Sequence, residues 1–170
     1  VPPSTTEDMA ARILEEEAEG KAGVKFGLAV NPEFLREGEA LEDTFKPDRI
    51  IIGGIDERSV HILQDIYVDL HGLKAPPVVK TTPINAELIK YAGNSFLAMK
   101  VSFINMISNL CQRLPCADVE VVAKAVGLDK RIGPLFLKSG AGWGGSCWPK
   151  DLKALKSFAE QLGVSLPLVD

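Results

Sequence analysis

The sequence predicts an α/β segment over residues 1–82, followed by an all-helical segment over residues 83–170 that contains one long helix. Short apolar runs alternate with amphipathic runs only in the first segment, and a long apolar run with helical period occupies residues 85–112. Of the 170 residues, 46% are hydrophobic and 25% are charged. This composition supports a buried core and excludes a disordered tail, a disulfide miniprotein and a collagen-like rod.

In the first segment we expect the order helix, strand, strand, helix, strand. Met9, Ile13 and Leu14 share one side of an amphipathic run at residues 7–19, behind the N-cap candidates Ser4 and Thr5. The predicted strands are residues 24–30, 49–53 and 77–81, and the second helix is residues 57–70. Residues 33–48 are expected to form a loop or a broken helix.

The long helix at residues 85–112 carries apolar residues around most of its circumference, which predicts burial on nearly all sides. Its polar exceptions, Lys90, Asn94, Ser102 and Asn105, recur at spacings that place them on one stripe. Two shorter helices are predicted at residues 118–126 and 149–162, with Pro149 at the first helical position of the last.

Charge and cysteine spacing exclude several classes of partner. A formal net charge of -4 gives no positive field for nucleic acid or anionic lipid. No run approaches the ~18–20 apolar residues of a membrane span, and no signal peptide is evident, so a cytoplasmic protein is the expectation. Cys111, Cys116 and Cys147 lack the spacing of a metal clip or a disulfide framework, and we expect no metal site. The chain begins without Met, and we expect it to be a piece of a longer protein.

A glycine-rich window at residues 139–151 is the most informative part of the sequence. Gly140, Gly142 and Gly145 formally satisfy the GxGxxG pattern, but no good strand precedes them and no helix follows directly. The window therefore favours a loop whose backbone N–H groups approach a ligand.

Cys147 lies just before the predicted helix start and beside Lys150, two features that favour a nucleophilic thiolate. The alternative for Cys147 is a small buried apolar residue, which is the role we assign to the other two cysteines. Asp151 fits a catalytic carboxylate and a first-turn dipole partner equally well.

Two further clusters could carry chemistry. Lys90 and Asn94 lie one turn apart on the apolar helix, where an ammonium needs an anionic partner or a function; an ion pair with Glu87 or with another chain is the alternative. Glu33 and Glu37 follow the end of a predicted strand, where α/β sheets bind ligands, although a solvated loop would have the same composition.

Together these windows resemble the UDP-glucose/GDP-mannose 6-dehydrogenase family over essentially the whole chain. Residues 31–38 resemble the segment NPEFLxEG, residues 47–54 the strand PDRxxIG, residues 87–94 the helix start ELxKxxxN, and residues 144–151 the loop GGSCxPKD. The resemblance implies the end of a Rossmann-like NAD domain over residues 1–82 and the central dimerisation domain over residues 83–170. It also implies a longer parent with a further nucleotide-binding domain.

The resemblance implies NAD-dependent oxidation of the C6 alcohol of a nucleotide sugar to the carboxylate, from UDP-glucose to UDP-glucuronate. Cys147 would form a thiohemiacetal and then a thioester. Lys90 would stabilise the oxyanion, Asn94 would hold that oxygen or a water, Asp151 would orient or activate the water, and Glu33 would act as general acid or base.

The same matches imply binding residues. For the cofactor these are Glu37, Cys147 and Lys150. For the substrate they are Phe34, Leu35, Arg36, Glu37, Lys90, Asn94, Arg131, Phe136, Leu137, Lys138, Gly142, Trp143 and Gly144. Arg131 would reach the sugar of a neighbouring subunit, which implies a homodimer formed through the helix at residues 85–112.

This sequence departs from the family pattern at Ser4, Trp143 and Trp148, where glycine and smaller or phenyl residues are more usual. A GDP-mannose 6-dehydrogenase is the alternative to a UDP-glucose enzyme. A single-step β-hydroxyacid dehydrogenase would share Lys90 and Asn94 but would need no Cys147. A non-catalytic dimerisation and nucleotide-binding module is the remaining alternative.

Overall fold

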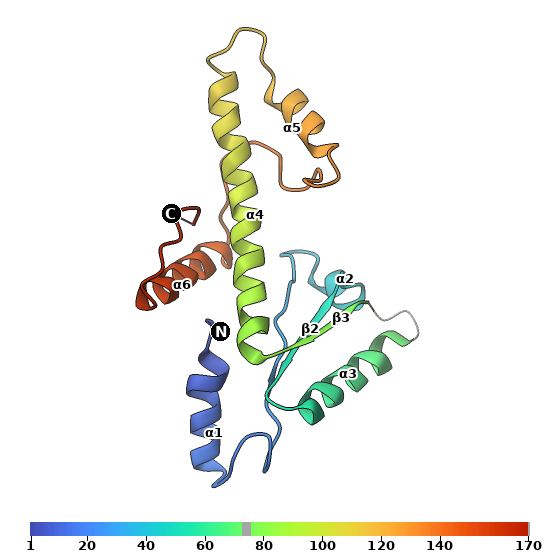
Figure 1. Cartoon of the computed structure of the whole chain (residues 1–170). Coiled ribbons are helices and arrows are strands. Elements are labelled where there is room, and N and C mark those ends of the chain that lie inside the picture. The colour runs from blue at the N-terminus through green and yellow to red at the C-terminus, as the bar shows by residue number, and fades with distance from the viewer. Residues whose placement is uncertain (73–75, 170) are drawn as a thin grey trace. The chain divides into compact units, whose positions relative to one another are not determined.

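The computed structural model describes residues 1–72 and 76–169 and forms two compact units, Val1–Lys90 and Tyr91–Asp170 (Figure 1). The unit boundary falls within the long helix α4 (Pro83–Cys111), whose first turns therefore belong to the α/β unit. The domain boundary expected after residue 82 stays a prediction.

The first unit is built on a three-stranded sheet in the order β1 (Ala29–Val30), β2 (Ile50–Gly54), β3 (Val78–Thr81). β1 pairs antiparallel with β2, and β2 pairs parallel with β3 after a crossover through α3 (Glu57–His71) (Figure 1). The central strand is the core, because Ile50, Ile51 and Ile52 are 4%, 2% and 0% exposed. The predicted strand at residues 24–30 is wrong except at its last two residues, which form β1.

The N-terminal helix begins as a π-helical turn, η1 (Thr6–Ala10), and continues as α1 (Ala11–Glu17). The apolar side of this run is not buried, because Met9 and Ile13 are 60% and 55% exposed. The buried residues are the small Thr6 and Ala11, and the Thr5 side chain makes no capping bond. The expected broken helix between the first two strands is confirmed as α2 (Ala40–Phe45).

Thr6 is held by a buried carboxylate on α4. Glu87 is 2% exposed, and its Oε1 accepts hydrogen bonds from the Thr6 amide at 2.9 Å and from the Thr6 hydroxyl at 2.5 Å. A buried carboxylate needs such donors to offset the loss of water. Glu87 thereby ties η1 to the start of α4.

The second unit is helical and contains the rest of α4, α5 (Val119–Gly127) and α6 (Trp148–Gln161). All three helices were predicted to within two residues at either end. The Asp118 carboxylate caps α5 by accepting from the Glu120 amide. Within the described residues, no helix has the length and apolar character needed to cross a bilayer. The cytoplasmic location stays a prediction.

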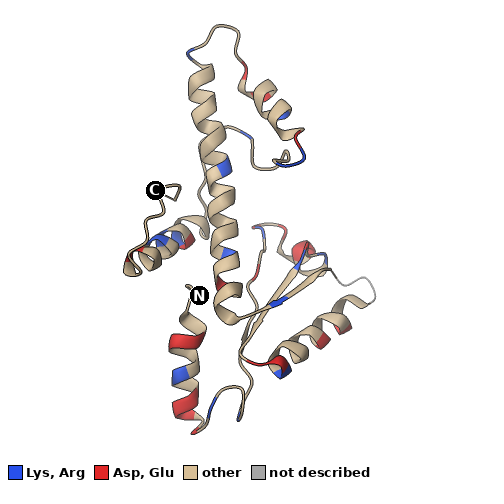
Figure 2. Ribbon diagram, viewed as in Figure 1, with Lys and Arg blue, Asp and Glu red and all other residues tan. Residues whose placement is uncertain are grey.

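α4 is long, nearly free of charge (Figure 2) and only partly covered. Tyr91, Ala98 and Ile104 are buried, whereas Phe96 and Met106 are 58% and 61% exposed. Burial on nearly all sides is therefore wrong for the chain by itself. An apolar helix face remains open to solvent.

Gly53 at the end of β2 is required by close packing. A Cβ added there would lie 2.6 Å from the Ala86 Cβ and 2.8 Å from the Pro83 Cα, both in the first turn and a half of α4. Real Cβ atoms do not approach other heavy atoms so closely, and both of these atoms belong to one rigid helix. Gly53 thus lets α4 begin directly against the central strand.

We predict that Gly53→Ala lowers the free energy of unfolding by about 1–3 kcal/mol, because α4 must move away from β2. Gly93→Ala in the interior of α4 is the matched control, since its Cβ would meet nothing within 4 Å. Alanine is the better helix former, so the control should be neutral or stabilising. Urea unfolding measures both, and equal stability of the two variants would contradict this packing.

Candidate active site

The loop expected to carry substrate-binding residues begins at a firmly placed asparagine. The Asn31 Nδ2 donates to the Ile51 carbonyl on β2 at 2.7 Å, and the Tyr67 hydroxyl on α3 donates to the Asn31 Oδ1. The single side chain thus bridges strand and helix where β1 ends. Pro32 follows and restricts the backbone further.

Glu33 and Lys90 form an ion pair within the first unit. The Lys90 Nζ donates to the Glu33 carboxylate and, at 3.1 Å, to the Glu33 backbone oxygen. The Lys90 side chain is 16% exposed, whereas that of Glu33 is 51% exposed. Glu33 is therefore the anionic partner of Lys90, and the alternative pairing with Glu87 is wrong because Glu87 bonds Thr6.

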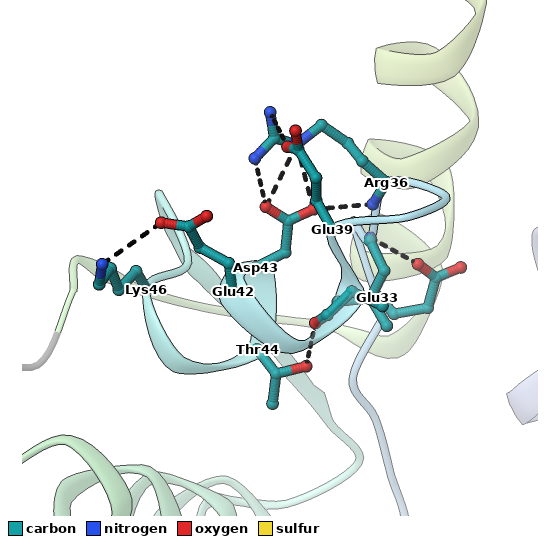
Figure 3. A network of polar contacts seen from close by, with 9 residues as sticks. Glu33, Arg36, Glu39, Glu42, Asp43, Thr44 and Lys46 are labelled. Atoms are coloured by element: carbon teal, nitrogen blue, oxygen red, sulfur yellow. Dashed lines mark hydrogen bonds and ion pairs between the residues drawn. The ribbon is translucent and has the colours of Figure 1, made fainter.

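Arg36 and Asp43 form a second set of contacts, which holds the loop that follows Glu33 (Figure 3). The Arg36 guanidinium donates to both carboxylate oxygens of Asp43, at 2.6 Å from Nη2, and the Arg36 amide donates to the same carboxylate at 2.8 Å. Glu39 also pairs with the guanidinium at 2.6 Å. The hydrogen bonds from Arg36 hold the pKa of Asp43 below its usual value.

Phe34 and Leu35 lie in the sequence between Glu33, which pairs with Lys90, and Arg36, which pairs with Asp43. The Arg49 guanidinium stacks over the Phe34 ring at 4.2 Å from the centroid, a cation–π contact. The Leu35 amide donates to the Glu33 carboxylate at 2.8 Å, and the Leu35 side chain is 43% exposed. The loop is therefore ordered by its own contacts, with Leu35 and Glu37 facing solvent.

Asp151 is the most buried charged group of the second unit. Its side chain is 1% exposed, and it accepts from the Asn94 Nδ2 at 2.7 Å and from the Lys150 Nζ at 2.5 Å. The bond to Asp151 raises the pKa of Lys150, with smaller contributions from the charges of Tyr91 and Cys147. Asp151 is thus more than a first-turn dipole partner.

Cys147 is the N-cap residue of α6, and its backbone is already helical, with φ -89° and ψ -55°. Its thiol is partly exposed, and Sγ lies 3.6 Å from the Ser146 hydroxyl. Cys111 is buried, as expected, but Cys116 is exposed, so the role of a small buried residue is wrong for Cys116.

The remaining predicted residues of the second unit lie along the segment that leads to Cys147. Leu137 is 5% exposed, and Trp148 packs between Phe136, at 5.8 Å between ring centroids, and Trp143, at 6.4 Å. Lys138 lines a shallow hollow with residues of α5. Gly142 and Gly144 are exposed, and Gly142 has φ 105°, which favours glycine.

Arg131 lies on an exposed turn after α5. Its guanidinium pairs with Asp129 at 2.6 Å, and its side chain is 88% exposed. The turn is attached to α4, because the Lys100 Nζ donates to the Ile132 carbonyl at 3.1 Å. Arg131 is therefore displayed on the surface of the chain.

The structure thus places the predicted site residues in two clusters. One cluster joins Glu33 with Lys90, and the other joins Asn94, Lys150 and Asp151 beside Cys147. The sequence analysis missed Asp43 and Arg49. Their partners are seven and fifteen residues away along an irregular loop, where no helical or strand spacing signals contact.

No group of three or more His, Cys, Asp or Glu side chains that could hold a metal ion occurs among residues 1–72 and 76–169.

Comparison with known proteins decides the family. Residues 1–71 match the NAD binding domain of the UDP-glucose/GDP-mannose dehydrogenase family, and residues 84–170 match its central domain. The chain belongs to this family. The two matches divide the chain near the start of α4, and they agree with a sheet-containing part followed by a helical part.

Relatives in this family align with nearly the whole chain. UDP-glucose 6-dehydrogenase TuaD of Bacillus subtilis is 44% identical over 99% of the chain. A UDP-glucose dehydrogenase structure from Pyrobaculum islandicum is 50% identical with a TM-score of 0.91, and covers 99% of the chain and 37% of its own. A GDP-mannose dehydrogenase structure from Pseudomonas aeruginosa is 35% identical with a TM-score of 0.72 over 99% of the chain and 38% of its own. The chain spans about a third of the length of these relatives, 35% for the Bacillus enzyme.

We predict that Asp43→Ala loosens the loop at residues 33–39 and that the effect depends on pH. Because the pKa of Asp43 is lowered in the folded state, its stabilising effect is complete above the unfolded pKa near 3.8 and is lost as pH falls through the folded pKa. Hydrogen exchange of the Arg36 amide should be faster in the variant at pH 6, and the difference should shrink below about pH 4.

Glu42→Ala is the control, since Glu42 is an acidic neighbour on the same helix that forms an exposed ion pair with Lys46 at 3.3 Å, whereas Asp43 accepts the hydrogen bonds of Arg36. Loosening of the loop by this control to the same degree would contradict the role of Asp43.

Proposed function

We propose that this chain is part of an NAD-dependent nucleotide-sugar 6-dehydrogenase that oxidises UDP-glucose to UDP-glucuronate. The observation that carries the proposal is the hydrogen bond from Asn94 to the buried Asp151 carboxylate, one helical turn after Cys147. It puts a carboxylate and an amide beside a partly exposed thiol at a helix N-terminus. The relatives named as UDP-glucose dehydrogenases support UDP-glucose as the substrate.

The residues assigned to NAD are Glu37, Cys147 and Lys150, and the chemistry of Lys150 fits a cofactor contact. An ammonium has three donors, so the bond of Lys150 to Asp151 does not exhaust it, and the Lys150 side chain is 65% exposed. It can therefore donate to an amide or phosphate oxygen. NAD, when bound, accepts the hydrides that leave C6.

Cys147 supplies the nucleophile in this proposal. Loss of two electrons and two protons converts the C6 alcohol to an aldehyde, and the Cys147 Sγ then adds to the carbonyl carbon to give a thiohemiacetal. Loss of two further electrons and two protons gives a thioester, and water displaces the thiol to leave the carboxylate. The thiol is regenerated, so Cys147 is unchanged after each cycle.

Lys90 stabilises the negative oxygen that develops at C6 in these steps. Its side chain is largely removed from water, which strengthens the interaction of the ammonium with an oxyanion. Asn94, bonded to Asp151 through Nδ2, can hold the same oxygen or a water with its remaining donor and its oxygen.

Two carboxylates assist the hydrolysis of the thioester by water. Asp151 orients or activates that water, and Glu33 acts as general acid or base. Glu33 is held by Lys90 and by the Leu35 amide, which fixes the carboxylate in one position. A positioned carboxylate is what general acid–base catalysis requires.

The assigned substrate contacts come from two loops. Those of the first unit are Phe34, Leu35, Arg36 and Glu37, and those of the second are Arg131, Phe136, Leu137, Lys138, Gly142, Trp143 and Gly144. Because Arg36 is engaged by Asp43 and Glu39, it acts mainly by shaping its loop. A GDP-mannose enzyme is the second candidate, favoured by the similarity to the Pseudomonas structure.

We predict that Cys147→Ser in the full-length protein abolishes the four-electron reaction, because a serine hydroxyl is a far weaker nucleophile at neutral pH. Counting NADH formed per nucleotide sugar consumed should give two for the unchanged protein with one donor. UDP-glucose, GDP-mannose and UDP-N-acetylmannosamine are compared side by side.

Cys116→Ser is the matched control, since Cys116 is also accessible but is not an N-cap residue, and α5 is capped by Asp118 instead. One NADH per sugar, or full activity of Cys147→Ser, would favour a single-step hydroxyacid dehydrogenase. No turnover of any donor by the full-length protein would favour a non-catalytic module.

We further propose that the protein is a homodimer formed through α4. Phe96, Phe103, Met106 and Leu110 are 58%, 44%, 61% and 55% exposed, and they recur at spacings of seven, three and four residues along one side of the helix. A second copy of the same helix covers such a face with no new sequence, as two-fold symmetry allows. Arg131, displayed on its exposed turn, then extends toward the neighbouring subunit.

We predict that the double variant Phe103→Glu/Met106→Glu is monomeric in sedimentation experiments, because two buried carboxylates per helix would lack partners. Val121→Glu on α5, where Val121 is 64% exposed, is the control and should stay dimeric. A monomeric unchanged protein, or a dimeric double variant, would contradict this interface.

A further inference from the structure

The polar stripe of α4 has two members to which the proposed chemistry gives no function. Lys90 bonds Glu33 and Asn94 bonds Asp151, but Ser102 and Asn105 lie two turns or more farther along the helix. Both nevertheless make hydrogen bonds, and both bond the glycine-rich loop that precedes Cys147.

The two hydrogen bonds hold the glycine-rich loop at separate residues. The Asn105 Oδ1 accepts from the Gly140 amide at 2.9 Å, and the Ser102 Oγ accepts from the Trp143 indole Nε1 at 2.8 Å. Ser102 and Asn105 are three residues apart and so neighbours on the helix surface. Between the two contacts lies Gly142, whose φ of 105° lets the loop turn.

The contact between Ser102 and Trp143 is linked to Cys147 through a second tryptophan. The Trp143 ring packs on the Trp148 ring at 6.4 Å between centroids, and Trp148 is the first residue of α6, next to Cys147. Fixing the Trp143 indole on α4 therefore restrains the residue that follows Cys147. A phenyl ring at position 143 could pack on Trp148 but could not donate to Ser102.

We propose that Ser102 and Asn105 are positioning residues that hold the glycine-rich loop, and through Trp143 and Trp148 hold Cys147, for reaction. Trp143 is thereby an anchor of the loop on α4 in addition to a wall of the substrate site. The effect on turnover rests on the proposed function of Cys147, whereas the restraint on the loop does not.

The test measures hydrogen exchange of residues 139–146 in the full-length protein. Ser102→Ala and Trp143→Phe should each speed exchange by about two- to tenfold, the factor expected for one net hydrogen bond. The two changes together should have no larger effect than either alone, because they remove the same bond. Asn105→Ala should speed exchange at Gly140, and Asn105→Asp, which keeps an acceptor oxygen, should restore protection.

Ser95→Ala is the matched control, since Ser95 is on the same helix and its buried hydroxyl has no hydrogen-bond partner within the described residues. Exchange in α5 serves as the internal reference and should not change in any variant. Unchanged exchange of residues 139–146 in Ser102→Ala and Trp143→Phe, or an equal rise in Ser95→Ala, would overturn the proposal.

Turnover separates this proposal from the proposed function. The kcat of Ser102→Ala should fall by a similar two- to tenfold while the NADH formed per sugar stays the same. If Cys147→Ser keeps full activity although the loop loosens as expected, the proposed chemistry fails and the restraint on the loop stands. If Cys147→Ser is inactive and exchange in the loop is unchanged, the positioning role fails alone.

Discussion

α4 is a 29-residue helix that carries three charged residues, Glu87, Lys90 and Lys100, and its polar side chains can hold other segments of the chain by hydrogen bonds. The four members of its polar stripe do so, and every partner belongs to a segment that carries a predicted site residue. The bond of Lys90 holds the loop at Glu33 within the first unit, and the bonds of Asn94, Ser102 and Asn105 hold α6 and the glycine-rich loop within the second.

Much of the fold followed from local pattern. The three helices of the second unit and the strands β2 and β3 were predicted from periodicity, from short apolar runs and from flanking Gly and Pro. The N-terminal helix was also expected, but its buried side was not. Glu87, a residue on α4 more than eighty positions away, holds Thr6, and the buried side of the helix is that of Thr6 and Ala11. A single-sequence pattern carries no information about such a distant partner.

The candidate site likewise has residues that the sequence predicted and residues that only the structure revealed. The motifs around Glu33, Lys90 and Cys147 were recognisable because their residue types and spacings are unusual. The residues that hold them in place were not, because the contact of Asp43 with Arg36 and that of Ser102 with Trp143 are tertiary. The stripe on α4 was visible as a periodicity, but its partners required the structure. Position 143 illustrates the difference, since a tryptophan there looked like a departure and proves to donate a hydrogen bond.

The central claim is that Cys147 becomes covalently bound to the oxidised sugar. The most direct test is to quench the full-length protein during turnover with UDP-glucose and NAD and to map the acylated peptides by mass spectrometry, using Asp151→Asn to slow hydrolysis. We expect a thioester of the nucleotide sugar acid on Cys147 that accumulates in Asp151→Asn and disappears on treatment with hydroxylamine. Turnover without any adduct on Cys147, or an adduct on another residue, would contradict the account.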